Sequence, residues 1–278
     1  LDWLESYEIQ LELLLAVVFF YLFIIHILTA RQALFDPATF RDRNFTIGIT
    51  LALIMGMLQF TPMILFPPLL QDLRGYPDSI VGYLISARGM GNFLSFFIVV
   101  QFTRFNARLC LFTGLALQSV AGLWMSSLDI NMTTADVFWT NILHGIGFGT
   151  AYTPMAVLAF STLPMHLLTQ GNAIFSLCRL LGSSIFIALT LVVFFRTSAE
   201  ATVNLSAMID AFDMRNLSLW ITILGEPGTP PLHARLLEEV RHQASMIGYI
   251  NAFHLLTLAS ALAAPLAFLF VIRKGAEA

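Results

Sequence analysis

The sequence has few charged residues and only two cysteines. Asp, Glu, Lys and Arg together make up 11% of its 278 residues, whereas an ordinary soluble domain contains about 25%. Apolar residues make up 58%. This composition excludes a soluble globular protein, and it also excludes a disordered chain, because the charge is too low and the apolar content too high. The sequence has no basic patch that could neutralise nucleic-acid phosphates. The chain is therefore predicted to have lipid as its main solvent.

The sequence also lacks the residue patterns of metal sites and of intramembrane enzymes. Cys110 and Cys178 lie inside apolar runs, where cysteine is usually a small buried hydrophobe, and no histidine clusters with either. No Asp or Glu lies near the middle of an apolar run, so an aspartyl protease is excluded. The Gly-Ser-Ser at 182–184 lacks a loop frame for a serine protease, and the last apolar run has no central Lys for a retinal Schiff base. We expect no enzyme activity, metal or cofactor.

Seven apolar segments are long enough to cross a bilayer as helices, which takes about 20 residues. They are continuous runs rather than alternating ten-residue strands, so they predict helices and not a β-barrel. The fold class is predicted to be all-α, a polytopic membrane protein with seven transmembrane helices. The predicted spans are residues 10–30, 45–70, 79–101, 107–127, 137–161, 171–195 and 244–272.

The distribution of Lys and Arg predicts the orientation in the membrane. Positive residues in short connections favour the cytoplasmic side. The connections after the first and third spans and the C-terminus carry Arg31, Arg41, Arg43, Arg104, Arg108, Arg273 and Lys274, whereas the short connections on the other side carry only Arg74. The N-terminus of this chain is therefore predicted to lie outside and the C-terminus in the cytoplasm.

The connection between the last two spans, residues 196–243, is predicted to be a long external loop. Pro227, Gly228 and Pro230 divide it, and residues 232–243 resemble a short amphipathic helix that leads into the last span. Two interpretations stay open: a solvated connector, or a docking surface for a periplasmic or extracellular partner.

Two arginines are predicted to lie inside membrane spans, Arg88 in the third and Arg179 in the sixth. An ionisable residue within a membrane is costly, so each marks a functional position by default. Asn92 shares a helix face with Arg88, and Gly89 and Gly91 would let a neighbouring helix approach closely. Arg88 could donate to carbonyls across a helix interface or contact a substrate directly.

Polar stripes run along the fifth and sixth predicted spans. In the sixth, Asn172, Ser176 and Arg179 follow a helical spacing, which is typical of a helix that faces the bundle interior or a water-filled cavity. In the fifth, Asn141, His144, Phe148, Tyr152 and Met155 share one face that is part polar and part aromatic, as a site for amphipathic ligands would be. Structural packing and cavity lining both remain possible for these stripes.

Several stretches resemble the fourteen-helix EmrB/QacA-type drug/proton antiporters of the major facilitator superfamily. Residues 36–48 (DPATFRDRNFTIG) resemble the junction before the second six-helix half of these antiporters, and residues 66–92 resemble the second and third helices of that half. Residues 102–109 (FTRFNARL) stand where the family has a cytoplasmic basic turn, but they lack its Asp-Arg pair and glycines. Residues 145–155 and 171–186 resemble the glycine-rich and Arg-containing stretches that follow.

The resemblance implies half of a transporter. Residues 1–35 would form a linker helix and its cytoplasmic connection, and residues 36–278 the C-terminal six-helix bundle. The chain starts without Met, as if within a longer protein. The implied function is proton-coupled export of hydrophobic or amphipathic compounds by alternating access across the bacterial inner membrane. The implied partners are the N-terminal half, small hydrophobic drugs and protons, with a periplasmic adaptor and an outer-membrane channel as further candidates.

The resemblance also assigns roles to the candidate residues. The residues expected to line the substrate cavity are Gln59, Phe60, Met63, Asn141, His144 and Tyr152. The polar residues expected to flank it are Arg88, Asn92, Asn172, Ser176 and Arg179, and the cytoplasmic basic turn would hold Arg104 and Arg108.

Two other classes of function stay open. The chain could be a self-contained seven-helix binding or channel protein. It could also be an inactive truncated remnant, which would expose polar groups of the cavity face to lipid at a high free-energy cost.

Overall fold

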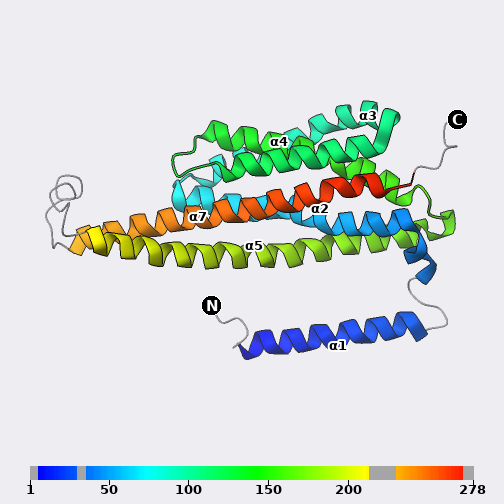
Figure 1. Ribbon diagram of the computed structural model, residues 1–278, viewed down its shortest axis with the longest axis horizontal. Coiled ribbons are helices and arrows are strands. Elements are labelled where there is room, and N and C mark those ends of the chain that lie inside the picture. Colours follow the sequence, from blue (N-terminus) through cyan, green and yellow to red (C-terminus); the bar gives the residue numbers. More distant parts are fainter. Residues whose placement is uncertain (1–5, 30–35, 213–229, 272–278) are drawn as a thin grey trace.

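The computed structural model describes residues 6–29, 36–212 and 230–271, and these residues are almost entirely helical (Figure 1). They include seven stretches that are long and apolar enough to cross a membrane, and no strand, which confirms the predicted all-α polytopic class. The long helices are α1 (Tyr7–Thr29), α2 (Arg43–Pro68), α3 (Asp78–Ser126), α4 (Thr134–Phe160), α5 (Leu168–Phe212) and α7 (Pro230–Ala263). Short helical turns are η2 (Pro37–Arg41), η3 (Leu69–Leu73), η4 (Met165–Leu167) and η5 (Ala264–Leu269).

Helix α3 contains two spans that meet at Asn106. The first arm is Asp78–Thr103 and the second arm is Phe105–Ser126. Asn106 has non-helical dihedrals (φ −162°, ψ 103°), and its side-chain Oδ1 accepts from the backbone N–H groups of Arg108 at 3.0 Å and Leu109 at 3.3 Å. An Asn in this role caps the N-terminus of the helix that follows. The predicted basic turn is therefore a tight reversal held by Asn106.

Replacing Asn106 with alanine is expected to lower the free energy of unfolding by about 1 kcal/mol, because the cap would be lost. Asn106→Asp should keep most of it, since a carboxylate accepts the same two N–H groups. Thermal unfolding of the two purified variants beside the unchanged protein measures the difference. Equal stability of the alanine and aspartate variants would contradict the capping role.

The spans of the bundle form two layers. One layer is a row of four segments in the order first arm of α3, α4, α2 and α5, because each packs against the next. The second arm of α3 and α7 pack behind this row, where Ser119 contacts Ser260 at 2.9 Å and the ring of Phe112 lies 5.1 Å from that of Phe268. In the row, α2 and α4 are central and more buried than the first arm of α3 and α5. By contrast, no residue of the apolar stretch Tyr7–His26 of α1 is buried.

The ends of α5 and α7 correct the prediction of a long external loop. Helix α5 continues through residue 196 to Phe212 and is 45 residues long, which at 1.5 Å per residue is ~67 Å, about twice the hydrocarbon thickness. The sequence has no Pro or Gly between residues 183 and 224 to stop it. Helix α7 already begins at Pro230, which confirms a helix over residues 232–243. The rest of the predicted loop, residues 213–229, lies outside the described residues.

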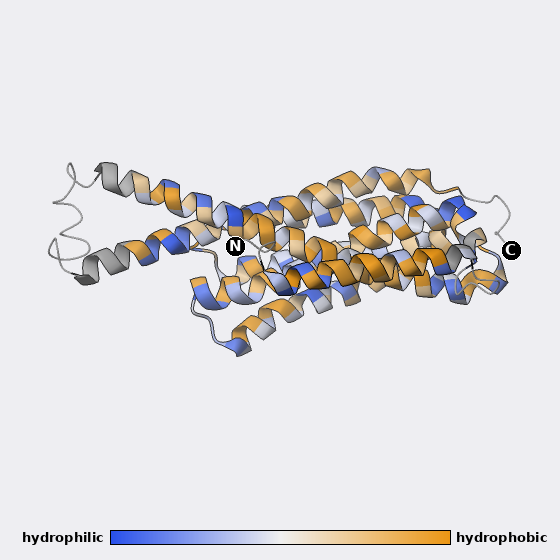
Figure 2. Ribbon diagram, turned by 90° about the horizontal axis from the view of Figure 1, so that it is seen from below, coloured by the Kyte–Doolittle hydropathy of each residue, from blue (hydrophilic) through white to orange (hydrophobic). Residues whose placement is uncertain are grey.

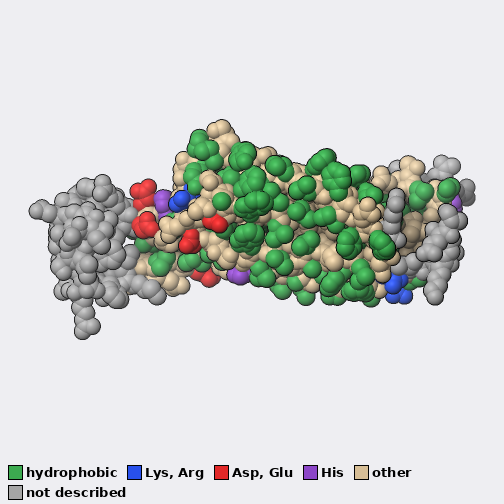
Figure 3. Space-filling model, turned by 90° about the horizontal axis from the view of Figure 1, so that it is seen from above, with side chains coloured by type: hydrophobic (Ala, Val, Ile, Leu, Met, Phe, Trp, Pro, Cys, Tyr) green, Lys and Arg blue, Asp and Glu red, His purple; other side chains and the backbone are tan. Residues whose placement is uncertain are grey.

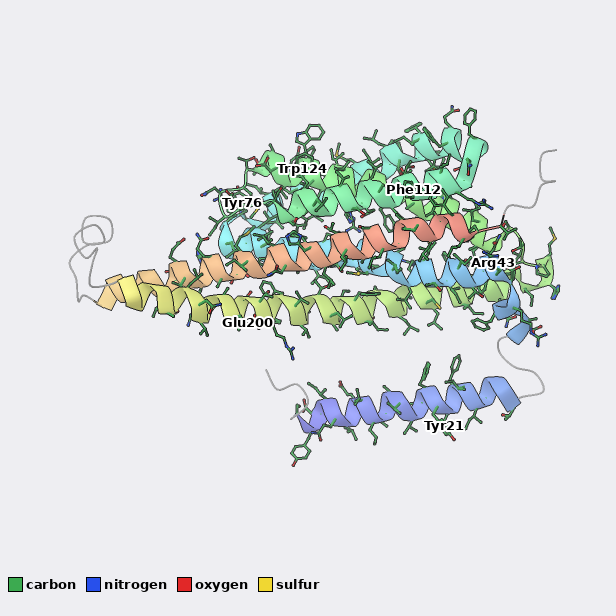
Figure 4. All side chains as sticks on the ribbon, viewed as in Figure 1. Tyr21, Arg43, Tyr76, Phe112, Trp124 and Glu200 are labelled. Atoms are coloured by element: carbon green, nitrogen blue, oxygen red, sulfur yellow. The ribbon has the colours of Figure 1, made fainter. Side chains whose placement is uncertain are left out.

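These helix ends project from one end of the bundle. Figure 2 shows α5 and α7 extending beyond the other helices, with hydrophilic residues near the projecting end. Glu200, labelled in Figure 4, lies on the part of α5 that leads to this projecting end. In Figure 3, hydrophobic side chains cover the middle of the visible face, while Asp and Glu gather near the projecting end. This distribution is typical of a bundle whose middle is in contact with lipid.

A buried asparagine joins three elements at the opposite end of the bundle. Asn44 is 1% exposed, and its Nδ2 donates to the Val271 carbonyl at 2.8 Å while its Oδ1 accepts from the Val271 N–H at 2.8 Å. The same Nδ2 also donates to Ser161 Oγ at 3.2 Å. Asn44 thus ties the start of α2 to the end of α4 and to the segment after η5.

Candidate functional site

Helices α2 and α5 cross closely at a pair of glycines. A Cβ added to Gly56 would collide with the Arg179 carbonyl, and a Cβ added to Gly182 would collide with the Leu53 carbonyl. Small residues at such crossings let two helix backbones touch inside a membrane. The crossing fixes the position of Arg179 against the centre of α2.

The first arm of α3 and α4 cross in the same way. A Cβ on Gly91 would collide with the Ile142 carbonyl, and a Cβ on Gly145 would collide with the Arg88 carbonyl. The prediction that Gly91 permits close approach is confirmed. The same prediction for Gly89 is wrong, because a Cβ there would have no neighbour within 4 Å.

The two crossings share one register. At each crossing, a glycine packs against a backbone carbonyl of the partner helix. That carbonyl belongs to the residue three positions before the glycine of the partner helix. Arg179 precedes Gly182 by three positions, and Arg88 precedes Gly91 by three. The two arginines therefore occupy equivalent positions on the two outer segments of the row, on either side of α2 and α4.

Three of the predicted cavity and flanking residues meet across helices. Arg179 Nη1 donates to Gln59 Oε1 at 2.8 Å, and its guanidinium lies 6.0 Å from the centre of the Tyr152 ring, within cation–π range. Tyr152 stacks on Phe148 with 5.6 Å between ring centres and lies 6.3 Å from Phe175. Residues from α2, α4 and α5 thus form one polar and aromatic cluster, the Arg179 cluster.

Asn141 and His144 are enclosed by the bundle in this structure. Asn141 is 1% exposed and donates to the Val137 carbonyl of its own helix. His144 is fully buried and lies beside the backbone of Leu58. Neither ring nitrogen makes a well-formed hydrogen bond to a described residue.

The remaining predicted residues lie apart from the Arg179 cluster or at its margins. Met63 is 53% exposed, Asn92 and Asn172 are exposed, and Phe60 and Ser176 are half-buried. Asn92 also packs against α4, where a Cβ on Gly149 would collide with it. In the basic turn, Arg108 has a buried Nε without a described partner, and the side chain of Arg104 lies outside the described residues.

Sequence reasoning missed a buried polar layer at the depth of His144. Gln118 is fully buried, and its Nε2 donates to the His144 carbonyl at 3.0 Å while its Oε1 has no described partner. Thr61 is 2% exposed, and its hydroxyl likewise has no described partner. These residues separate an apolar cluster around Leu58 from another around Leu65. A lone Gln within an apolar span was the signal that could have pointed to this layer.

The described residues do not form a metal-binding cluster. In the described ranges, no set of three or more His, Cys, Asp or Glu side chains could hold a metal ion. The side chains that do converge are hydrogen-bond donors, acceptors and aromatic rings. Such a set offers both polar and apolar contacts to an amphipathic molecule.

Comparison with known proteins identifies relatives among multidrug exporters. The chain is 23% identical over 258 residues to the multidrug export protein EmrB of Haemophilus influenzae, covering 91% of this chain and 50% of that protein. It is 27% identical over 190 residues to the colistin resistance protein EmrB of Acinetobacter baumannii, covering 68% and 37%. It is 24% identical over 182 residues to the fatty acid resistance protein FarB of Neisseria gonorrhoeae, covering 65% and 36%. No family model matches the chain.

These similarities confirm the resemblance to EmrB-type multidrug transporters. The chain spans half or less of the length of these curated relatives.

Proposed function

We propose that this chain, which is similar to EmrB-type multidrug exporters, is the C-terminal half of a proton-coupled multidrug efflux transporter. The observation that carries the proposal is the similarity to a multidrug export protein over 91% of the chain. Residues 36–278 would form one six-helix bundle of a major facilitator fold, and residues 1–35 a linker helix. The relatives are transporters, so we expect transport and no enzyme activity.

The arrangement of the helices in two layers supports this proposal. In transporters built from two related halves, substrates bind near the bilayer midplane at the interface of the halves. The row formed by the first arm of α3, α4, α2 and α5 carries the Arg179 cluster, and the second layer covers its back. A preceding half would pack on this row and enclose a cavity that Gln59, Tyr152 and Arg179 line.

The way the bundle is built supports the proposal of alternating access. The two glycine crossings join the first arm of α3 to α4 and α2 to α5, and Gly48 of α2 packs on Ala159 of α4. The row can therefore rock as one body against a second bundle. Hydrophobic or amphipathic compounds would enter from the cytoplasm or inner leaflet and leave outward, driven by protons. Because no carboxylate lies near the middle of the described spans, the coupling carboxylate would belong to the preceding half.

The proposed location is the bacterial inner membrane, with the N-terminus of this chain outside and the C-terminus in the cytoplasm. The arginines at the end opposite the projection, Arg41, Arg43 and Arg108, support this orientation, because positive residues in short connections favour the cytoplasmic side. In this orientation the projection lies outside, where it could contact a periplasmic adaptor that leads to an outer-membrane channel.

The complete reading frame containing this chain is expected to lower ethidium accumulation several-fold in a pump-deficient bacterium, and collapse of the proton gradient should abolish the effect. Gln59→Ala and Tyr152→Ala should restore accumulation, because they remove the partners of Arg179. Tyr21→Ala is the matched control, since Tyr21 is 62% exposed on α1. If cells with the complete reading frame accumulate as much ethidium as cells without it, the proposed efflux is refuted. If the Gln59 and Tyr152 variants both export ethidium as well as the unchanged protein does, the proposed site is refuted.

A further inference from the structure

A crevice lies between α2, α5 and α7, toward the end of the bundle from which α5 and α7 project. Its volume is about 290 Å³, close to the lower end of the range for small-molecule pockets, about 300–1,000 Å³. None of its described lining residues belongs to the Arg179 cluster. Leu191, which lines it, follows Arg179 by twelve positions, or ~18 Å along α5. The crevice is therefore a separate site.

The end of α2 is irregular next to this crevice. Pro67 and Pro68 are its last two residues, and proline has no N–H, so Pro68 cannot donate to the Ile64 carbonyl four positions earlier. The chain then continues as the π-helical turn η3, and single π-turns are frequent at functional sites. This turn places Asp72 on the lining of the crevice, together with Ile64 and Pro68.

Three polar side chains line the crevice, namely Asp72 from η3 and Ser245 and Tyr249 from α7. None of them makes a hydrogen bond or an ion pair with another described residue. Tyr249 is 5% exposed, so its hydroxyl is a nearly buried polar group, which is costly unless a ligand or water pairs with it. All three side chains can accept hydrogen bonds, and the described lining includes no basic residue. The set therefore favours a cation with N–H donors.

The basic side chains near the crevice do not neutralise Asp72. Arg74, two positions further along the chain, donates instead to the Ile130 carbonyl at 2.9 Å. Arg196 of α5 and Arg241 of α7 are exposed and form no ion pair with a described residue. The negative charge of Asp72 is thus free to pair with a ligand.

The crevice has its polar and apolar parts at the depths that a lipid leaflet has them. Asp72 lies next to the end of the span Arg43–Leu73, and the ends of spans lie at the membrane–water interface. Ile64 lies eight positions deeper, ~12 Å along the helix, and the facing walls include Leu191 and Phe194. A molecule with a charged head and an apolar chain would place its head at Asp72 and its chain against these walls.

We propose that this crevice binds a primary ammonium group carried on an apolar chain. A primary ammonium has three N–H donors for the acceptors Asp72, Ser245 and Tyr249, whereas a trimethylammonium group has none. The head of phosphatidylethanolamine has this chemistry, and the depth of the crevice in the leaflet favours this lipid over a free alkylammonium. The inference goes beyond the proposed function, because such binding requires neither efflux nor proton coupling.

The test uses the protein encoded by the complete reading frame, examined by native mass spectrometry with equal amounts of phosphatidylethanolamine and phosphatidylcholine of the same acyl chains. Phosphatidylethanolamine is expected to be retained about tenfold more strongly, because only its ammonium donates charge-assisted hydrogen bonds. Asp72→Asn should remove this preference, Tyr249→Phe should reduce it, and Asp72→Glu should keep most of it. Asp129→Asn is the matched control, since Asp129 is an exposed aspartate at the same end of the bundle and does not line the crevice.

Two competitors distinguish the lipid from a free amine. Dodecylammonium should displace phosphatidylethanolamine, and dodecyltrimethylammonium should not. If dodecylammonium binds in a manner that depends on Asp72 while the two lipids are retained equally, the site is confirmed with a free amine as its occupant. Equal retention of the two lipids together with equal binding of the two amines would overturn the site.

The remaining controls separate this inference from folding and from the proposed function. Each variant is first shown to be monodisperse by size exclusion. A lipid preference that survives in Asp72→Asn would also overturn the site. Because binding is measured without transport, ethidium efflux that persists without any ammonium preference leaves the proposed function standing alone. Preferential binding in a protein that exports no ethidium would establish the site and refute the efflux.

Discussion

Alanine at Gly91 is expected to destabilise the full-length protein, whereas alanine at Gly89, two residues away on the same helix, is expected to leave it unchanged or stabilise it. A Cβ on Gly91 would collide with the Ile142 carbonyl and lie 3.0 Å from the Ile146 nitrogen. These are backbone atoms of α4, so only separation of the two helices can relieve the overlap. Overpacking of this kind costs about 1–3 kcal/mol.

The Gly89 variant is the matched control for this prediction. Its added methyl group would meet nothing within 4 Å, and alanine is about 1 kcal/mol more favourable than glycine inside a helix. Thermal unfolding of both purified variants in the same detergent measures the difference. If Gly89→Ala and Gly91→Ala had the same melting temperature, the close crossing of α3 and α4 would be refuted. Gly182→Ala tests the equivalent crossing of α2 and α5, with the same expected loss.

Leucine at Asn44 is expected to have the second large effect, a loss of about 2–4 kcal/mol in the free energy of unfolding. The substitution removes two hydrogen bonds of 2.8 Å to Val271 and one of 3.2 Å to Ser161. Each bond contributes about 1 kcal/mol, and backbone groups left without partners add a desolvation penalty of about 1–3 kcal/mol. The segment after η5 should detach from the start of α2.

Limited proteolysis near the C-terminus, together with thermal unfolding, tests this second prediction. Asn44→Leu should expose the chain around Val271 to cleavage at temperatures where the unchanged protein is resistant. Asn172→Leu is the control, because Asn172 is an exposed asparagine on α5. Equal resistance to cleavage in the Asn44 and Asn172 variants would show that the bonds to Val271 do not hold this end.

The spans and the polar positions within them could be predicted from the sequence because both depend on local properties. Hydropathy summed over about 20 residues identifies a membrane span whatever it packs against, and all seven predicted spans are present. A charged residue such as Arg88 or Arg179 is conspicuous in an apolar run for the same reason. Pairing was not predictable: Arg179 and Gln59 are 120 positions apart, and no local pattern relates them.

The wrong predictions rested on local sequence features that are compatible with two different structures. The segment from 196 to 212 is more polar than the span before it, which indicated a loop, but it contains no helix breaker, and α5 continues through it to Phe212. Gly89 and Gly91 look equivalent in sequence. Only Gly91 faces α4, since two residues on a helix are separated by about 200°.

The sequence by itself thus determined that this protein is a helical membrane bundle, where its spans lie, and which charged side chains it holds in the membrane. The tertiary structure decided which helices touch, which glycines lie where two helix backbones meet and which polar side chains are buried. The physical reason is that transfer from water to lipid is a sum over local segments, whereas close packing depends on the shape of a partner helix far away in the chain.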